Sequence, residues 1–92
     1  MKSNSVTKKF GKLLRIDASF GDKIETIKIT GDFFIHPEDT LDQIVEFLTG
    51  ISVPLDEDFL AKELNFIIDG NEAQLIGISV DNIIETLEEV TQ

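Results

Sequence analysis

The chain has 92 residues, of which 41% are hydrophobic and 28% charged, and its formal net charge is −10. This length predicts a single domain, residues 1–92, and the composition is typical of a globular protein rather than a disordered one. The sequence has neither an apolar run of membrane-spanning length nor a signal peptide, so we expect no membrane association and a cytoplasmic location. The absence of cysteine excludes disulfides, thiolate metal sites and a cysteine nucleophile.

Charge is distributed unevenly along the sequence. Residues 1–15 carry five of the eight basic residues and no acidic one, whereas residues 16–92 carry all 18 acidic residues. The acidic body repels phosphate backbones, so we expect neither nucleic acid nor an anionic membrane as a partner. Residues 1–8 are expected to be a flexible basic tail. For Lys8 to Arg15 two interpretations stay open: solvated surface charges, or a basic segment that approaches a phosphate or an acidic partner.

Alternating apolar and polar residues predict a β-hairpin in the first part of the chain. The first strand covers Lys12–Phe20, and Gly21-Asp22 follows it as a two-residue turn signal. The second strand runs from Lys23 to about Ile35. This turn places Ile16 near Ile27. The expected inward residues are Leu14, Ile16, Ala18 and Phe20 on the first strand and Ile27, Ile29, Gly31, Phe33 and Ile35 on the second.

Apolar residues spaced three and four apart predict three helices in the rest of the chain. The first begins at Pro37 or at Thr40, because Thr40 and Gln43 have capping-box spacing, and Gly50 ends it. Its apolar stripe comprises Leu41, Ile44, Val45 and Leu48.

The second helix is expected between Pro54 and Gly70, and the third begins near Ser79 or Asp81. The apolar segment Ala73–Ile78 between them predicts a brief third strand, at an edge. An isolated hairpin is unstable, so helices must cover its apolar face. The expected fold class is α+β: two layers, with a small antiparallel sheet of the N-terminal hairpin plus the short third strand, covered on one face by about three helices.

Groups that carry covalent chemistry are scarce. His36 is the only histidine, no serine lies in a nucleophile-elbow motif, and neither a Walker A loop nor a GxGxxG motif occurs. No spacing of His, Asp and Glu resembles a metal triad, and the carboxylates are spread over helix faces. We therefore expect no catalytic residue, no metal site and no covalent chemistry from this chain alone.

Two adjacent phenylalanines stand between the second strand and the first helix, in the segment TGDFFIHP. Alternation places Phe33 inward, as a core residue. Phe34 then lies on the opposite, polar face, either under another element or on a contact surface.

Three further residues of this segment each have a local interpretation. Gly31 inside a strand indicates a bulge or the close approach of another backbone. Asp32 either turns the chain locally or pairs with a cation of a partner. His36, held extended before Pro37, is expected at the surface or as a cap.

About residues 9–50 resemble the C-terminal accessory domain of lipoate–protein ligases. The shared features are Gly11-Lys12-Leu13 at the entry to the first strand, a glycine at the hairpin turn, and I-x-G-D-F-F closing the second strand, here with Gly31-Asp32-Phe33-Phe34. A proline, acidic residues and a helix ending in L-x-G follow, here Pro37 and Gly50. Phe10 stands where the family has the first glycine of a Gly-Gly pair, so a role that needs both glycines does not carry over.

In such ligases a larger catalytic domain uses lipoate, ATP and Mg to form lipoyl-adenylate. It then moves the lipoyl group to a lysine of an acceptor, such as the E2 subunit of 2-oxoacid dehydrogenases or the glycine-cleavage H protein. The accessory domain is fused in some members and separate in others, and this chain resembles the separate version. The resemblance implies an accessory subunit that docks on the catalytic chain and by itself binds no cofactor.

The resemblance also implies roles for individual residues. Positions close to the partner or its nucleotide are Lys9, Gly11, Lys12, Asp32, Phe34 and His36, and structural positions are Gly31, Phe33, Pro37 and Gly50. The family often has a lysine a few residues before the Gly-Lys step, and either Lys8 or Lys9 occupies that position here. Lys12 keeps two interpretations: a lysine that reaches nucleotide phosphates, or a strand-edge lysine that opposes aggregation.

Two other function classes compete with this one. A free-standing α+β interaction or scaffold module, similar to sulfur-assembly proteins, has the absence of every cysteine against it. A small hydrolase or metal-binding protein lacks a residue constellation to support it. A ligase chain that forms lipoyl-adenylate only in the presence of this protein would separate the accessory role from both.

Overall fold

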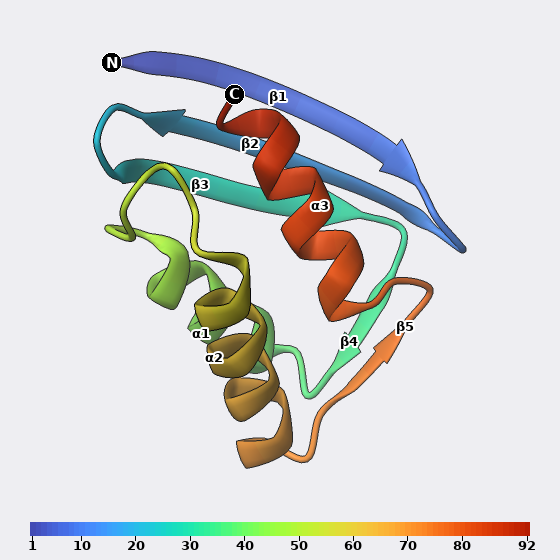
Figure 1. The fold of residues 1–92 in the computed structure, drawn as a ribbon. Coiled ribbons are helices and arrows are strands. Elements are labelled where there is room, and N and C mark those ends of the chain that lie inside the picture. Colours follow the sequence, from blue (N-terminus) through green and yellow to red (C-terminus); the bar gives the residue numbers. More distant parts are fainter.

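A computed structural model describes residues 1–92. In chain order the elements are β1 (Lys2–Lys9), β2 (Leu13–Phe20), β3 (Ile24–Gly31), β4 (Phe34–His36), α1 (Asp39–Leu48), α2 (Glu57–Gly70), β5 (Gln74–Ile76) and α3 (Val80–Val90) (Figure 1). Strands β1, β2 and β3 form an antiparallel sheet in that order, and β4 pairs with β5 in a separate two-stranded sheet. The α+β class expected from the sequence is confirmed.

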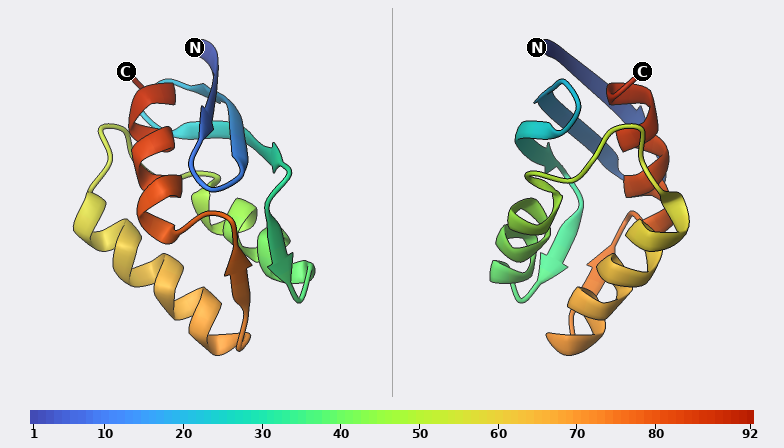
Figure 2. Two further views of the ribbon diagram at one scale, coloured as in Figure 1. Left: turned by 90° about the vertical axis from the view of Figure 1, so that its right-hand side faces the viewer. Right: turned by 60° about the vertical axis from the view of Figure 1, so that its left-hand side comes forward.

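The helices form a second layer against the three-stranded sheet (Figures 1 and 2). Helix α3 packs on β1 and β2, α1 packs on β3 and β4, and α2 contacts both α1 and α3. None of the three has the length and the apolar content that crossing a bilayer would require. The opposite face of the three-stranded sheet is left without a covering helix.

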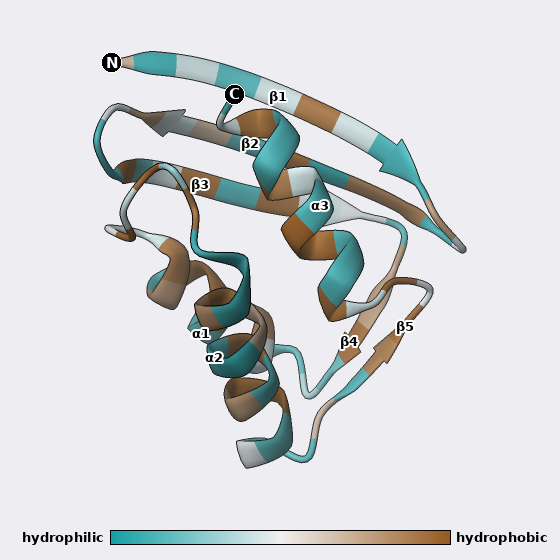
Figure 3. Ribbon diagram, in the orientation of Figure 1, coloured by the Kyte–Doolittle hydropathy of each residue, from teal (hydrophilic) through white to brown (hydrophobic).

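The hydrophobic core lies between the sheet and the helices. All four inward residues expected on β2 are buried there, against Ile83, Leu87 and Val90 of α3. Figure 3 shows the apolar residues as bands along β2 and along the helices, separated by polar ones. Each fully buried leucine or isoleucine contributes about 1.5–3 kcal/mol. Half of the 16 core residues lie on β2 and α3, and most of the others lie on β3, α1 and α2.

Residues 1–8 were expected to be a flexible tail, and this expectation was wrong. Lys2–Lys9 forms β1 and pairs with β2 along its full length. Val6 packs against the core, and the Lys8 ammonium forms ion pairs with Glu85 and Glu89 of α3. The strand was missed because it has only one apolar residue facing inward, and its order comes from contacts with distant parts of the chain.

The register of the hairpin also differs from the expected one. Ile16 lies opposite Ile29, two residues beyond the predicted Ile27. The cause is at the turn: Phe20 pairs with Ile24, and the register shifts between Ser19 and Phe20. A two-residue turn without a bulge was therefore the wrong assumption.

The second predicted strand is divided into two. Strand β3 ends at Gly31, and Phe34–His36 forms β4, which pairs with β5. The apolar segment near residue 75 is thus a strand, but it does not join the hairpin as expected. The third strand of the main sheet is β1.

The helices begin and end close to the predicted residues. Helix α1 starts at Asp39 without a side-chain cap, and Thr40 is buried in its first turn instead of forming a capping box. The carboxylate of Asp56 accepts a hydrogen bond from the Phe59 N–H at 3.1 Å and caps α2. Ser79 caps α3 in a capping box with Asn82.

Candidate functional site

Three chain connections meet at one end of the three-stranded sheet. They are the loop between β1 and β2, the link between β3 and β4, and the turn between β5 and α3. The Lys12 N–H donates to the Gly77 carbonyl at 2.9 Å, and the Asp32 N–H donates to the Leu13 carbonyl at 3.2 Å. We call this junction, residues 10–13, 31–34 and 76–77, the sheet corner.

The backbones at the sheet corner approach each other closely at two glycines, Gly31 and Gly11. Gly31 has φ of +153°, and a Cβ added there would lie 2.1 Å from the Leu13 carbonyl oxygen. A Cβ on Gly11 would lie 3.0 Å from the carbonyl oxygen of Gly77. Both obstacles are backbone atoms. This geometry therefore depends on glycine at position 31, while a side chain at position 11 requires Gly77 to shift by a few tenths of an ångström.

Asp32 is engaged within the chain itself. Its Oδ1 accepts a hydrogen bond from the Leu13 N–H at 2.6 Å, while its own N–H bonds to Leu13 as described above. These two bonds fasten the end of β3 to the start of β2. The contact is the local role that an aspartate next to a glycine commonly has.

Three apolar side chains are exposed at the sheet corner. Leu13 is 42% exposed, Phe34 64% and Ile76 51%. Phe34 and Ile76 are paired between β4 and β5, so their side chains share one face of that ribbon. Leu13 and Phe34 each precede a buried residue in a strand, and therefore point away from the core. We call these three residues the apolar patch.

Two lysines border the apolar patch. Lys9 lies opposite Leu13 at the end of β1, and the stem of Lys12 lies against Gly77, whose added Cβ would be 2.2 Å from the Lys12 Cγ. Both lysines are exposed and neither takes part in an ion pair. The ammonium groups of Lys9 and Lys12 are therefore two unpaired positive charges beside the apolar patch.

The structure gathers some of the residues singled out in the sequence and separates others. Gly11, Lys12, Gly31, Asp32 and Phe34 meet at the sheet corner, with Lys9 at its margin. Phe33, also in the corner, is partly buried and packs against the core. His36 is exposed at the far end of β4, opposite Gln74, and Pro37 follows it. Gly50 bonds to Ile24 at the opposite end of β3.

Sequence reasoning missed Leu13, Ile76 and Gly77. Leu13 is an apolar residue on the polar face of an alternating strand, the same signal that pointed to Phe34. Ile76 and Gly77 gave no such signal, because their position depends on the pairing of β4 with β5.

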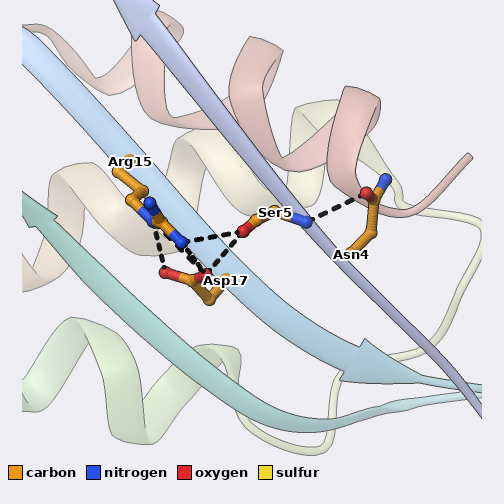
Figure 4. A network of polar contacts seen from close by, with 4 residues as sticks. All are labelled: Asn4, Ser5, Arg15 and Asp17. Carbon is orange, nitrogen blue, oxygen red and sulfur yellow. Dashed lines mark hydrogen bonds and ion pairs between the residues drawn. The ribbon is translucent and has the colours of Figure 1, made fainter.

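The uncovered face of the sheet carries a polar network around Asp17 (Figure 4). Arg15 donates to both carboxylate oxygens of Asp17, with its closest contact at 2.9 Å, and the Ser5 hydroxyl donates to Oδ1 at 2.6 Å. The hydrogen bonds from Arg15, which have the largest effect, and from Ser5 lower the pKa of Asp17 from 3.8 to about 2. The network therefore favours the ionised carboxylate.

Asp17→Asn is expected to flatten the loss of thermal stability in acid. The lowered pKa means that Asp17 contributes stability above about pH 3.8, its ordinary value, and loses it as pH falls toward 2. In that window the unfolded chain binds more protons than the folded one. The melting temperature measured from neutral pH to about pH 2 checks this. Arg15→Met should flatten the same part of the curve, and a variant curve parallel to that of the wild type would contradict the role of the pair.

The helical side of the molecule is strongly acidic. Residues 37–92 carry 14 of the 18 acidic residues and only Lys62 among the basic ones, whereas residues 1–36 carry the other seven basic residues. A groove of about 460 Å³ between α2 and α3 is lined by carboxylates, and burial together with the charge of Glu57 raises the pKa of Glu88. No group of His, Cys, Asp and Glu is arranged to hold a metal ion. The molecule is thus divided into a basic sheet side and an acidic helical side.

Comparisons with known proteins give one informative similarity. No protein-family model matches the chain, and no curated protein matches it significantly. A solved structure of an archaeal lipoylation system, described as a bi-partite lipoate protein ligase and its E2 lipoyl domain from Thermoplasma acidophilum, is similar with a TM-score of 0.64 and 27% identity. The match covers 95% of this chain and 93% of that chain. The fold is therefore related to that of a component of a lipoylation system.

Proposed function

We propose that this chain is the accessory subunit of a two-chain lipoate–protein ligase. It docks on the catalytic chain and supports ATP-dependent formation of lipoyl-adenylate. The catalytic chain then transfers the lipoyl group to lysines of acceptors such as 2-oxoacid dehydrogenase E2 or the glycine-cleavage H protein. The observation that carries the proposal is the exposed apolar patch, formed by the GDFF segment and its neighbours in a lipoylation-related fold.

The apolar patch has the anatomy of a docking surface. Its aromatic residue, Phe34, is largely exposed in the isolated chain and is paired across the β4–β5 ribbon with the exposed Ile76. Glu38 and Asp42 line the same hollow as Phe34, and Lys9 and Lys12 are exposed at the sheet corner. Interfaces commonly place an aromatic anchor at the centre and polar groups at the rim.

The sheet corner can contact the phosphates of a nucleotide, but it has no pocket suited to hold the whole nucleotide. Lys9 and Lys12 have no ion-pair partner, and exposed lysines of this kind bind phosphates. Phe34 lines an open hollow of about 430 Å³ beside α1, and Glu38 and Asp42, which also line it, disfavour anions. We infer that the catalytic chain holds lipoate, ATP and Mg, and that the two lysines of this chain face the phosphates. ATP bound there supplies the adenylyl group.

The proposal is tested by reconstitution. The catalytic ligase chain of the same organism is incubated with lipoate, ATP and Mg, with and without this protein, and pyrophosphate release is followed. Release that requires both chains, together with co-elution in gel filtration, is the expected result. Equal release by the catalytic chain alone, without co-elution, would favour the interaction-module alternative.

The same reaction separates an accessory subunit from a lipoyl acceptor. The similar lipoylation system also contains an E2 lipoyl domain. An acceptor gains the mass of a lipoyl group on one lysine, whereas an accessory subunit keeps its mass. Intact-mass spectrometry after the reaction is expected to show an unmodified chain, and a lipoylated lysine would contradict the proposal.

A further inference from the structure

The outer edge of β1 is not covered by any other part of the chain. β1 is the first strand in the order of the three-stranded sheet, and only β2 pairs with it (Figure 2). It is eight residues long, contains no proline and pairs with β2 without a bulge. An edge of this length and regularity is competent to pair with a further strand.

The backbone groups that line this edge can be assigned. The N–H and C=O of Leu13 both bond to Asp32, so the backbone groups of Leu13 face β3. Its partner Lys9 therefore directs its N–H away from β2, as does Ser5 further along the same strand. The Ser5 N–H donates to Oδ1 of Asn4 at 2.9 Å. Alternate residues of a strand direct their backbone groups the same way, so those of Ser3, Thr7 and Lys9 also face outward. No main-chain hydrogen bond outside the ladder with β2 involves these three residues. Three donors are therefore available for a new strand.

The charge around the edge selects the kind of segment that fits. β1 carries no acidic residue, and its Lys2 and Lys9 have no ion-pair partner, whereas Lys8 is already paired with Glu85 and Glu89 of the acidic helical side. An acidic segment is attracted to this edge and repelled by the rest of the molecule. The same lysines disfavour pairing with a second copy of β1, since like charges would face each other.

The edge is continuous with the apolar patch. Lys9, at the end of β1, lies opposite Leu13 of the patch. A partner seated on the patch can therefore extend a segment along β1.

We propose that β1 accepts an extended acidic segment of the catalytic ligase chain as a fourth strand of the sheet. Main-chain hydrogen bonds to Ser3, Thr7 and Lys9 supply affinity, and the lysines supply selectivity. This inference rests on the proposed function and adds the mode of binding and the chemistry of the partner segment.

Amide hydrogen exchange, resolved by residue with NMR, tests the inference in the complex of this chain with the catalytic ligase chain. The outward amides of Ser3, Thr7 and Lys9 should exchange rapidly in the free chain and about tenfold or more slowly in the complex. The inward amides of Val6 and Lys8, already bonded to β2, should be slow in both states.

A pair of variants at one position provides an independent test. Thr7→Pro removes an outward donor while leaving the bonds to β2, because proline is tolerated where the N–H faces away from the sheet. It should weaken binding about tenfold, whereas Thr7→Ala, which keeps the N–H, should bind as the wild type does. Circular dichroism checks folding, and if the proline variant is unfolded the exchange measurement decides.

The remaining outcomes separate this inference from the proposed function. A complex that forms while the three outward amides stay rapid would overturn strand addition and leave the accessory role standing. Affinity that is insensitive to salt would overturn an acidic segment. If the outward amides of β1 become more protected from exchange as the concentration of the free chain rises, the edge pairs with a second copy of this chain instead. Absence of any complex would overturn both proposals.

Discussion

Replacing Phe34 by serine is expected to weaken binding to the catalytic ligase chain about 30-fold, which corresponds to about 2 kcal/mol. The phenyl ring is 64% exposed in the isolated chain, and it is the largest side chain of the apolar patch. Docking would bury this ring, and the serine variant lacks the favourable free energy of that burial. Folding should be little affected, because the neighbouring Phe33 and Ile35 make the core contacts. Isothermal titration calorimetry measures the affinity.

Phe66→Ser is the matched control. Phe66 lies on α2 and is 74% exposed, so the same substitution removes as large an apolar surface outside the sheet corner. Its affinity should equal that of the wild type. If both variants bind equally weakly, or if neither loses affinity, the apolar patch is not the docking surface.

The kinetics of adenylation distinguish docking from a direct chemical role of Phe34. A docking defect lowers lipoyl-adenylate formation when this chain is limiting, and a large excess of it restores the rate. A defect that persists at saturation would assign Phe34 to the reacting complex instead. The accessory role predicts recovery at saturation, because Phe34 carries no group for proton or phosphoryl transfer.

The helices and the central strand were predictable because their signals are local. Helix α3 has apolar residues at helical spacing and a capping serine at its start, and the structure begins it one residue after Ser79. In β2, four alternating apolar residues are all buried. In both elements the residues that determine the structure lie within a few positions of one another.

The remaining strands depend on pairing between distant parts of the chain. β1 has one inward apolar residue, Val6, and is held by β2 and by Glu85 and Glu89, about 80 residues away. β4 and β5 have three residues each, and neither can be stable without the other. Local alternation continues through Phe34, so it cannot show that the chain leaves the sheet after Gly31.

The residues of the candidate site also divide into those with a local sequence signal and those placed by pairing between distant segments. Phe34 was noticed because an aromatic residue on a polar face is a local anomaly. The convergence of Leu13, Phe34 and Ile76 follows from the β4–β5 ladder and from the bond between Lys12 and Gly77. A single sequence without this topology indicates one residue of the patch and not the patch itself.

Gly31→Ala is expected to lower the free energy of unfolding by about 3 kcal/mol, because it combines backbone strain with a steric clash. The added methyl group would lie 2.1 Å from the Leu13 carbonyl oxygen, in a residue whose φ is +153°. Relief requires the end of β3 to move away from β2, which breaks the two hydrogen bonds between Asp32 and Leu13. Urea denaturation followed by circular dichroism measures the change.

Gly21→Ala is the control for the general cost of replacing a glycine. A Cβ at Gly21 meets no atom within 4 Å, and its φ is not positive. Its unfolding free energy should stay within about 0.5 kcal/mol of the wild type.

Leu13 belongs to the apolar patch, so a shift of β3 away from β2 also displaces part of the docking surface. Gly31→Ala should then weaken partner binding even where the variant remains folded. A loss of stability below about 1 kcal/mol with unchanged binding would show that the sheet corner adapts to a side chain, and the docking surface would not depend on this glycine.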